Sequence, residues 1–126
     1  MSVDLESTIK NLATQIGQDA SKELADLVED KSRLPYLDSL ITKYVKYMGL
    51  SALARTDEDK KFYSEQTAHL EQTMEHVLVQ ERIVADAKMA AFLKRTITSI
   101  AVTFLTVAKE LVSAVVSGAI KGAMGG

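Results

Sequence analysis

The spacing of apolar residues along the chain predicts an all-α protein of three to four amphipathic helices. Apolar positions recur at intervals of three and four residues, which places them on one face of a helix with 3.6 residues per turn. No glycine or proline interrupts residues 50–117, so the last two helices could form one long bent helix. The expected helices lie at about residues 4–30, 35–48, 57–93 and 96–120.

The first predicted helix has a regular apolar stripe, and the second begins at the chain's single proline. Pro35 suits the first turn of a helix, and Gly49 is the kind of residue that follows a helix end. Gly17 lies inside the first helix at a cost of about 1 kcal/mol relative to alanine, which indicates a close backbone contact or a slight irregularity. The first stripe consists of Leu5, Ile9, Leu12, Ile16, Ala20, Leu24 and Leu27.

The third predicted helix has the clearest start signal in the chain. Thr56 is a residue type that caps helices, and acidic residues fill the turn after it up to Asp59. A continuous helix over residues 57–117 would be about 90 Å long, whereas a compact domain of this size has a radius of gyration of about 14 Å. Either the helix breaks, or the protein is elongated and partners cover its protruding end. We expect a break or bend around residues 94–99, where basic and β-branched residues meet.

We divide the chain into an amphipathic region at residues 1–94, an apolar helix at residues 95–120 and a Gly-rich tail at residues 121–126. The apolar helix would pack on the first region or on partner copies. Its β-branched residues do not alternate with polar ones as in a strand, so we expect a helix. We predict a self-association or membrane-facing interface formed by Ile97, Ile100, Ala101, Phe104, Ala108, Leu111, Val115 and Ala119.

The opposite side of this helix carries a hydroxyl and charged stripe, formed by Ser99, Thr103, Thr106, Glu110, Ser113 and Ser117. The stripe could pack in the core of the chain, with its hydroxyls bonded to carbonyl groups of the preceding turn. It could instead permit close self-association, since Ala114, Gly118 and Gly122 are small residues at intervals of four. In a third interpretation, several copies line a water-filled pore with these residues and turn their apolar faces to lipid.

Charge and length limit a membrane role. A bilayer span needs about 20 apolar residues, and Lys109 and Glu110 would each cost roughly 2.5 to 3.5 kcal/mol at the centre of a span. A permanent transmembrane helix is therefore disfavoured. The net charge of −2 is unevenly distributed: residues 94–126 hold four basic residues and one acidic residue, or +3, which leaves −5 on residues 1–93. The cationic end is also the apolar end, a combination that anionic membrane surfaces attract.

The sequence predicts no catalytic site, no cofactor and no metal centre. Cysteine is absent, which excludes disulfides, zinc–thiolate sites and cysteine nucleophiles. No motif places a serine or threonine beside a histidine and an acid, and no glycine-rich loop joins a strand to a helix. A polar face of the third helix lacks the Glu-x-x-His pattern of metal sites in helical bundles, so we interpret it as solvated. This face consists of Glu65, His69, Gln72, His76 and Gln80.

Nucleic acid is not an expected partner. Three tyrosines lie near two lysines, a combination that could stack bases beside basic side chains. However, Tyr44 lies on an apolar stripe, and Glu29, Asp30 and Asp38 are close in sequence, so a basic groove is not expected. The residues in question are Tyr36, Tyr44, Tyr47, Lys43 and Lys46.

Together these patterns favour a non-enzymatic helical structural protein that self-associates, or is built into a larger particle, through its apolar C-terminal helix. Small components of virions and of secretion apparatus have this character. The alternative is a membrane-active helical protein that inserts residues 96–120 into lipid, for example as an oligomeric pore. The expected partners are thus other copies or other subunits of an assembly, with a membrane as the alternative. The N-terminus lacks a basic flank followed by an apolar run, so we expect synthesis in the cytoplasm without an export signal.

Overall fold

The computed structural model describes the backbone of residues 5–125 and the side chains of residues 5–115, and this part of the chain is helical without any strand. The all-α prediction is confirmed. The N-cap predicted at Thr56 is also confirmed, because its Oγ1 accepts a hydrogen bond from the backbone amide of Asp59 at 3.1 Å. The elements in chain order are α1 (Leu5–Glu23), η1 (Ala25–Leu27), η2 (Lys31–Arg33), α2 (Leu34–Ser51), α3 (Asp57–Gln80) and α4 (Ala87–Gly125).

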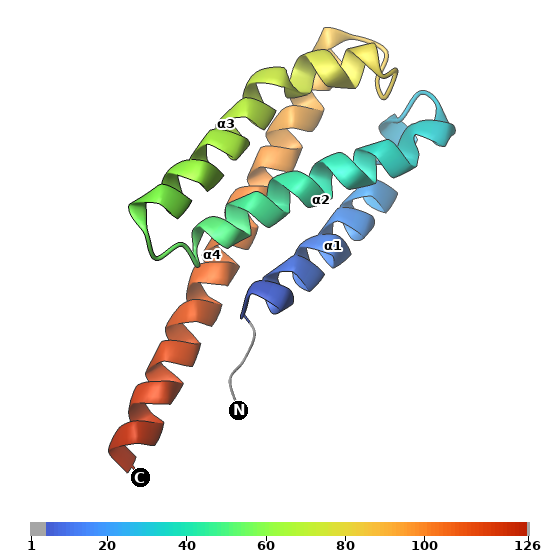
Figure 1. The fold of residues 1–126 in the computed structure, drawn as a ribbon. Coiled ribbons are helices and arrows are strands. Elements are labelled where there is room, and N and C mark those ends of the chain that lie inside the picture. The colour runs from blue at the N-terminus through green and yellow to red at the C-terminus, as the bar shows by residue number, and fades with distance from the viewer. Residues whose placement is uncertain (1–4, 126) are drawn as a thin grey trace.

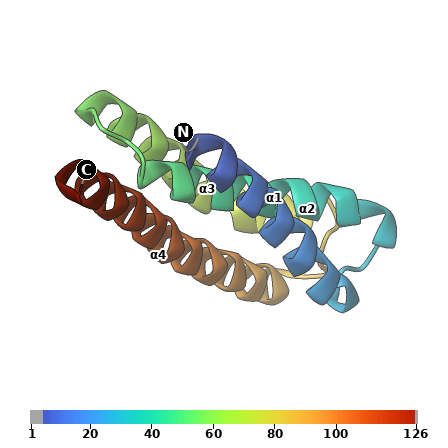
Figure 2. The same cartoon turned by 90° about the horizontal axis from the view of Figure 1, so that it is seen from below.

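The four α-helices form a bundle in which α2 is central (Figure 1). α1 runs antiparallel along one side of α2, α4 packs against another side, and α3 covers both α2 and α4 (Figures 1 and 2). α1 and α4 touch only slightly. The bundle is therefore closed between α2, α3 and α4 and open between α1 and α4.

All four α-helices contribute large apolar side chains to the core. The fully buried ones include Ile9, Leu37, Ile41, Tyr44, Met74, Leu78, Leu93, Ile97 and Phe104. The buried face of α1 differs from the predicted stripe, since it consists of Ile9, Ala13, Gly17, Ala20 and Ser21. Small residues predominate there because α1 lies close against α2. As a result, Leu12 and Ile16 face the open side toward α4.

Two glycines allow α2 to approach its neighbours closely. A Cβ at Gly17 would lie 1.9 Å from Thr42 Oγ1, so the close contact predicted at this glycine is confirmed. A Cβ at Gly49 would lie 2.4 Å from Phe104 Cε1 and 2.9 Å from Ile9 Cγ2. The prediction that Gly49 ends the second helix is wrong. Instead, α2 continues past this residue, whose missing side chain makes room for α1 and α4.

The first predicted helix, at residues 4–30, ends earlier than expected, at Glu23. Beyond this point the chain forms η1 and η2, and Val28 turns into the core. The backbone amide of Glu29 donates a hydrogen bond to the carbonyl oxygen of Ile83 at 2.9 Å. The connection between α1 and α2 is thereby tied to the turn between α3 and α4, which a continued helix would not permit.

The break between the third and fourth helices lies at residues 81–86. The prediction of a break at residues 94–99 is wrong, since these residues are helical within α4. Arg82 has a positive φ of 57° and ends α3 in the left-handed conformation that glycine usually supplies. The amide of Ile83 donates to the carbonyl oxygen of Leu78 at 2.9 Å, as in a Schellman motif. Both of these side chains are fully buried, which holds the turn in place.

After this turn the chain starts a new helix with its own cap. The carboxylate of Asp86 accepts a hydrogen bond from the backbone amide of Met89 at 2.9 Å, which satisfies an amide of the first turn of α4. Side chains also connect the two helices, since Lys94 Nζ lies 3.7 Å from Glu75 Oε1. α4 therefore folds back along α3 and does not extend it.

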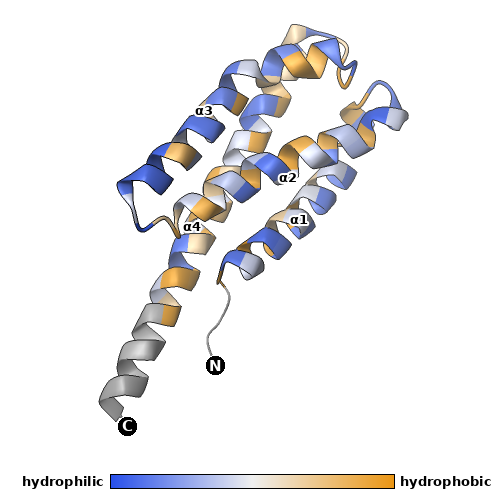
Figure 3. Cartoon of the chain, viewed as in Figure 1, coloured by the Kyte–Doolittle hydropathy of each residue, from blue (hydrophilic) through white to orange (hydrophobic). Residues whose placement is uncertain are grey.

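The length of α4 is about 58 Å at 1.5 Å per residue, and its C-terminal part extends beyond the other three α-helices (Figure 1). Among the described side chains, Ala108 is the last buried one. Figure 3 shows apolar residues both on the part of α4 inside the bundle and just beyond it. The helix also continues past its predicted end at residue 120, to Gly125. We call residues 109–125 the projecting segment.

Candidate interaction surface

The predicted apolar face of α4 is divided between the interior of the bundle and its surface. Four of its residues are buried against the chain's own helices, namely Ile97, Ala101, Phe104 and Ala108. Three others are partly exposed, namely Ile100, Leu111 and Val115. The side chain of Ala119 lies outside the described residues. In this fold a partner can reach only the edge of the face at Ile100 and the part beyond Ala108.

The hydroxyl and charged stripe faces solvent. Its described residues are all exposed, namely Ser99, Thr103, Thr106, Glu110 and Ser113, whereas the side chain of Ser117 lies outside the described range. Thr106 Oγ1 donates a hydrogen bond to the carbonyl oxygen of Val102 at 3.3 Å, so its hydroxyl is satisfied within the helix. The interpretation in which this stripe packs in the chain's own core is wrong. Self-association and pore formation stay predictions.

An apolar groove runs along the open side of the bundle between α1 and α4. Its volume is about 350 Å³. Leu12 on α1 is 36% exposed and Val107 on α4 is 40% exposed, so solvent reaches both walls. We call this hollow the α1–α4 groove; it is lined by Leu12, Ile16, Ser99, Ile100, Thr103, Phe104 and Val107. The sequence predicted the hydroxyl stripe and the apolar face of α4. It did not predict that α1 would leave the side of α4 with Ile100 and Val107 uncovered.

The projecting segment continues the apolar surface away from the bundle. Leu111, Val112 and Val115 are partly exposed, and none of residues 109–115 is buried. By length and composition alone, α4 from Ala87 to Val115 could cross a membrane, and 22% of its most apolar window is buried inside the fold. Most of this apolar helix is therefore accessible to a partner or to lipid.

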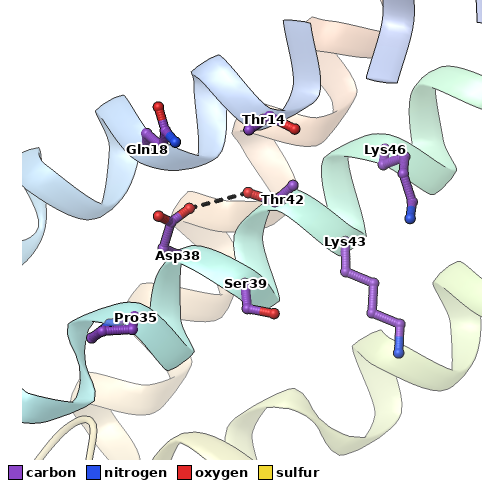
Figure 4. A pocket seen from close by; sticks show the side chains of 8 residues that line it. All are labelled: Thr14, Gln18, Pro35, Asp38, Ser39, Thr42, Lys43 and Lys46. Atoms are coloured by element: carbon purple, nitrogen blue, oxygen red, sulfur yellow. Dashed lines mark hydrogen bonds between the residues drawn. The ribbon is translucent and has the colours of Figure 1, made fainter. Parts of the chain in front are cut away.

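A second hollow, between α1 and α2, is polar (Figure 4). Its volume is about 390 Å³, and Thr14 and Gln18 of α1 face α2 across it. Thr42 Oγ1 donates a hydrogen bond to Asp38 Oδ1 at 3.2 Å. The lysine side chains at its edge extend away from this carboxylate, and the hydrogen bond between Thr42 and Asp38 joins successive turns of α2.

A polar contact inside the bundle joins three helices. The hydroxyl of Tyr44 on α2 donates a hydrogen bond to Glu71 Oε1 on α3. Burial raises the pKa of Tyr44, and the hydrogen bond to Glu71 adds to this effect, while a hydrogen bond with Thr98 on α4 opposes it. Tyr44 therefore keeps its proton well above neutral pH and is not a base. We interpret this cluster of Tyr44, Glu71 and Thr98 as a structural contact between helices and call it the Tyr44 clasp. The apolar spacing around Tyr44 did not predict it.

The histidine face of α3 is solvated, as interpreted from the sequence. Its residues are all exposed, namely Glu65, His69, Gln72, His76 and Gln80. The part of the chain that the structure describes contains no group of three or more histidine or acidic side chains that could hold a metal ion. Of the aromatic residues of α2, Tyr44 is buried and the ring of Tyr47 contacts those of Phe62 and Tyr63 at centroid distances of 6.4 and 6.2 Å, whereas Tyr36 is 38% exposed.

The α1–α4 groove and the projecting segment both involve α4, and both expose apolar side chains. Scans against protein-family models, curated proteins and solved structures found no match for this chain.

Proposed function

We propose that this protein is a non-enzymatic helical assembly protein that self-associates through the projecting segment of α4. The observation that carries the proposal is that Ala108 is the last buried residue among the described side chains, which extend to Val115, although the helix continues to Gly125. The projecting segment is about 25 Å long at 1.5 Å per residue. Its first turns present Leu111, Val112 and Val115, and complete burial of each such side chain contributes about 1.5 to 3 kcal/mol.

Helix stability gives a second reason to expect a partner. Isolated helices of about 12 to 15 residues are marginal in water, and most helical stability in proteins comes from packing of an apolar face. The chain's own helices fully bury none of the described side chains beyond Ala108. A second copy, or another subunit of a larger particle, would supply this packing.

Light scattering of the purified full-length protein tests the proposal. We expect a dimer or larger species whose dissociation is favoured by dilution. Leu111→Lys together with Val115→Lys should weaken association at least about tenfold, because charges would enter the contact. The matched control is Thr106→Lys with Ser113→Lys, which places the same charges on the exposed stripe. A full-length protein that stays monomeric in detergent-free buffer at high concentration would contradict the proposal.

A membrane-active role is the second candidate, favoured by the length and apolar composition of α4. Insertion has a structural cost, since Ile97 and Phe104 would have to leave their contacts with the rest of the bundle. Flotation with anionic liposomes and release of an entrapped dye test this role. Protein that stays in the aqueous fraction without dye release would rule out the membrane candidate and leave the assembly proposal intact.

A further inference from the structure

We propose that the α1–α4 groove receives the projecting segment of a second copy, in a reciprocal pair with antiparallel α4 helices. The inference rests on the proposed function, because it names the surface that the projecting segment would contact. Each copy would contribute one groove and one segment. The result is a closed dimer with twofold symmetry in which each groove and the groove side of each projecting segment are covered.

The wall of the groove and the projecting segment lie on one continuous face of α4. Ile100, Thr103, Val107, Leu111 and Ala114 follow at intervals of three and four residues, which places them along one side of the helix. The first three line the groove, and the last two belong to the projecting segment. A single helix face therefore carries both halves of the contact.

Lengths also agree with a reciprocal pairing. If two α4 helices cross antiparallel near Ala108, residues 99–107 of one copy lie opposite residues 109–117 of the other. Each stretch spans about 12 Å at 1.5 Å per residue. The first stretch is the part of α4 that lines the groove. The bundles then lie at opposite ends of the pair, so the α1 helices do not compete for the same space.

The distribution of charge also favours the projecting segment of a second copy as the occupant of the groove. The projecting segment carries a net charge of +1 and α1 carries a net charge of −1, so the two surfaces attract each other weakly. Asp19 and Glu23 are exposed on α1, further along the helix from Leu12 and Ile16. Salt screens such exposed charges, so the attraction supports the orientation of the pair more than its strength.

The shape of the groove distinguishes a helix from a bilayer. Leu12 and Ile16 on one helix and Ile100 and Val107 on another form two walls, with Phe104 between them. A helix that lies between two others can contact both walls, whereas a membrane surface would reach only the outer edges. Recognition of a helix by apolar residues at intervals of three and four is a common mode of docking.

Cross-linking can test the pairing cleanly because the chain contains no cysteine. Val107→Cys places a thiol close to the proposed twofold axis on the contact face. With a short bismaleimide, we expect this variant to form a covalent dimer in high yield. The matched control is Val102→Cys, since Val102 is more exposed, at 49%, but points away from the groove side of α4. This control should stay largely uncross-linked.

Substitution of the α1 wall provides the second measurement. Leu12→Lys should weaken the association of the full-length chain at least about tenfold, whereas Asn11→Lys on the exposed side of α1 should change it less than twofold. Circular dichroism spectra that match the wild type would show that both variants fold. If the chain associates but Val107→Cys does not cross-link, and Leu12→Lys has no effect, the groove is not the docking site and the proposed function stands. A monomeric chain would overturn both.

Discussion

Tyr44 shows how a residue on an apolar stripe can also make a buried polar contact. Its ring is fully buried, and its hydroxyl reaches Glu71 on a different helix, 27 residues along the chain. Sequence spacing predicts the burial of the ring, because Tyr44 follows Leu37 and Ile41 at helical intervals. It cannot predict the partner, since no local pattern indicates which residue of α3 lies opposite.

Replacement of this hydroxyl should therefore destabilise the fold. Tyr44→Phe leaves the Glu71 carboxylate without its donor, and we expect the free energy of unfolding at pH 7 to fall by about 1 to 2 kcal/mol. The pKa of Tyr44 is raised in the folded chain, so its contribution to stability is complete below about pH 10 and decreases as the pH rises above that value. Urea unfolding at pH 7 and pH 10.5 measures both effects.

Tyr36→Phe is the control for this prediction, because Tyr36 is 38% exposed. It should change the stability at pH 7 by less than about 0.5 kcal/mol. The difference between wild type and Tyr44→Phe should shrink at the higher pH. A Tyr44→Phe protein as stable as the wild type at pH 7 would show that the Tyr44 clasp contributes nothing.

At the scale of elements, the clearest lesson concerns the break between α3 and α4. Helix capping at Thr56 could be predicted because the cap and its partner are neighbours in sequence. The turn at residues 81–86 could not be predicted from glycine or proline, since Arg82 occupies the left-handed position. The available signal was the pair Leu78 and Ile83, whose spacing matches the apolar contact of a Schellman motif, followed by an aspartate that can cap the next helix.

Arg82 therefore offers a direct test of this turn. Arg82→Gly should raise the free energy of unfolding by about 1 kcal/mol, because glycine adopts a positive φ without steric cost. Glu81→Gly one residue earlier should lower the free energy by a similar amount, because Glu81 has a negative φ of −84° at the end of the helix. Thermal and urea unfolding of both variants would check the opposite signs. Equal effects of the two substitutions would mean that the turn is not constrained as described.

At the scale of the whole molecule, the sequence predicted that the apolar face of the C-terminal helix must be covered. It did not predict which part of this face the chain's own helices bury and which part they leave exposed. Ile97 and Val115 belong to the same predicted face, yet the first is fully buried and the second is not. The difference depends on where α2 and α3 end relative to α4. It also depends on the turn at Arg82, which sets how far α4 passes the rest of the bundle. Neither quantity is encoded in the spacing of apolar residues alone.

The difference between the buried part of α4 and its projecting segment predicts a gradient in the rate of amide hydrogen exchange along this helix. In dilute protein, amides up to Ala108 should exchange slowly, because they open only with the core, whereas amides beyond Ala108 should exchange nearly as fast as in an unstructured peptide. At concentrations where the chain associates, slow exchange should extend into the projecting segment. Leu12→Lys should remove this dependence on concentration and leave the protection of the bundle unchanged. Mass spectrometry of peptides from residues 90–108 and 109–125 resolves the two regions, and slow exchange of the second region in the monomer would mean that α4 is stable there without a partner.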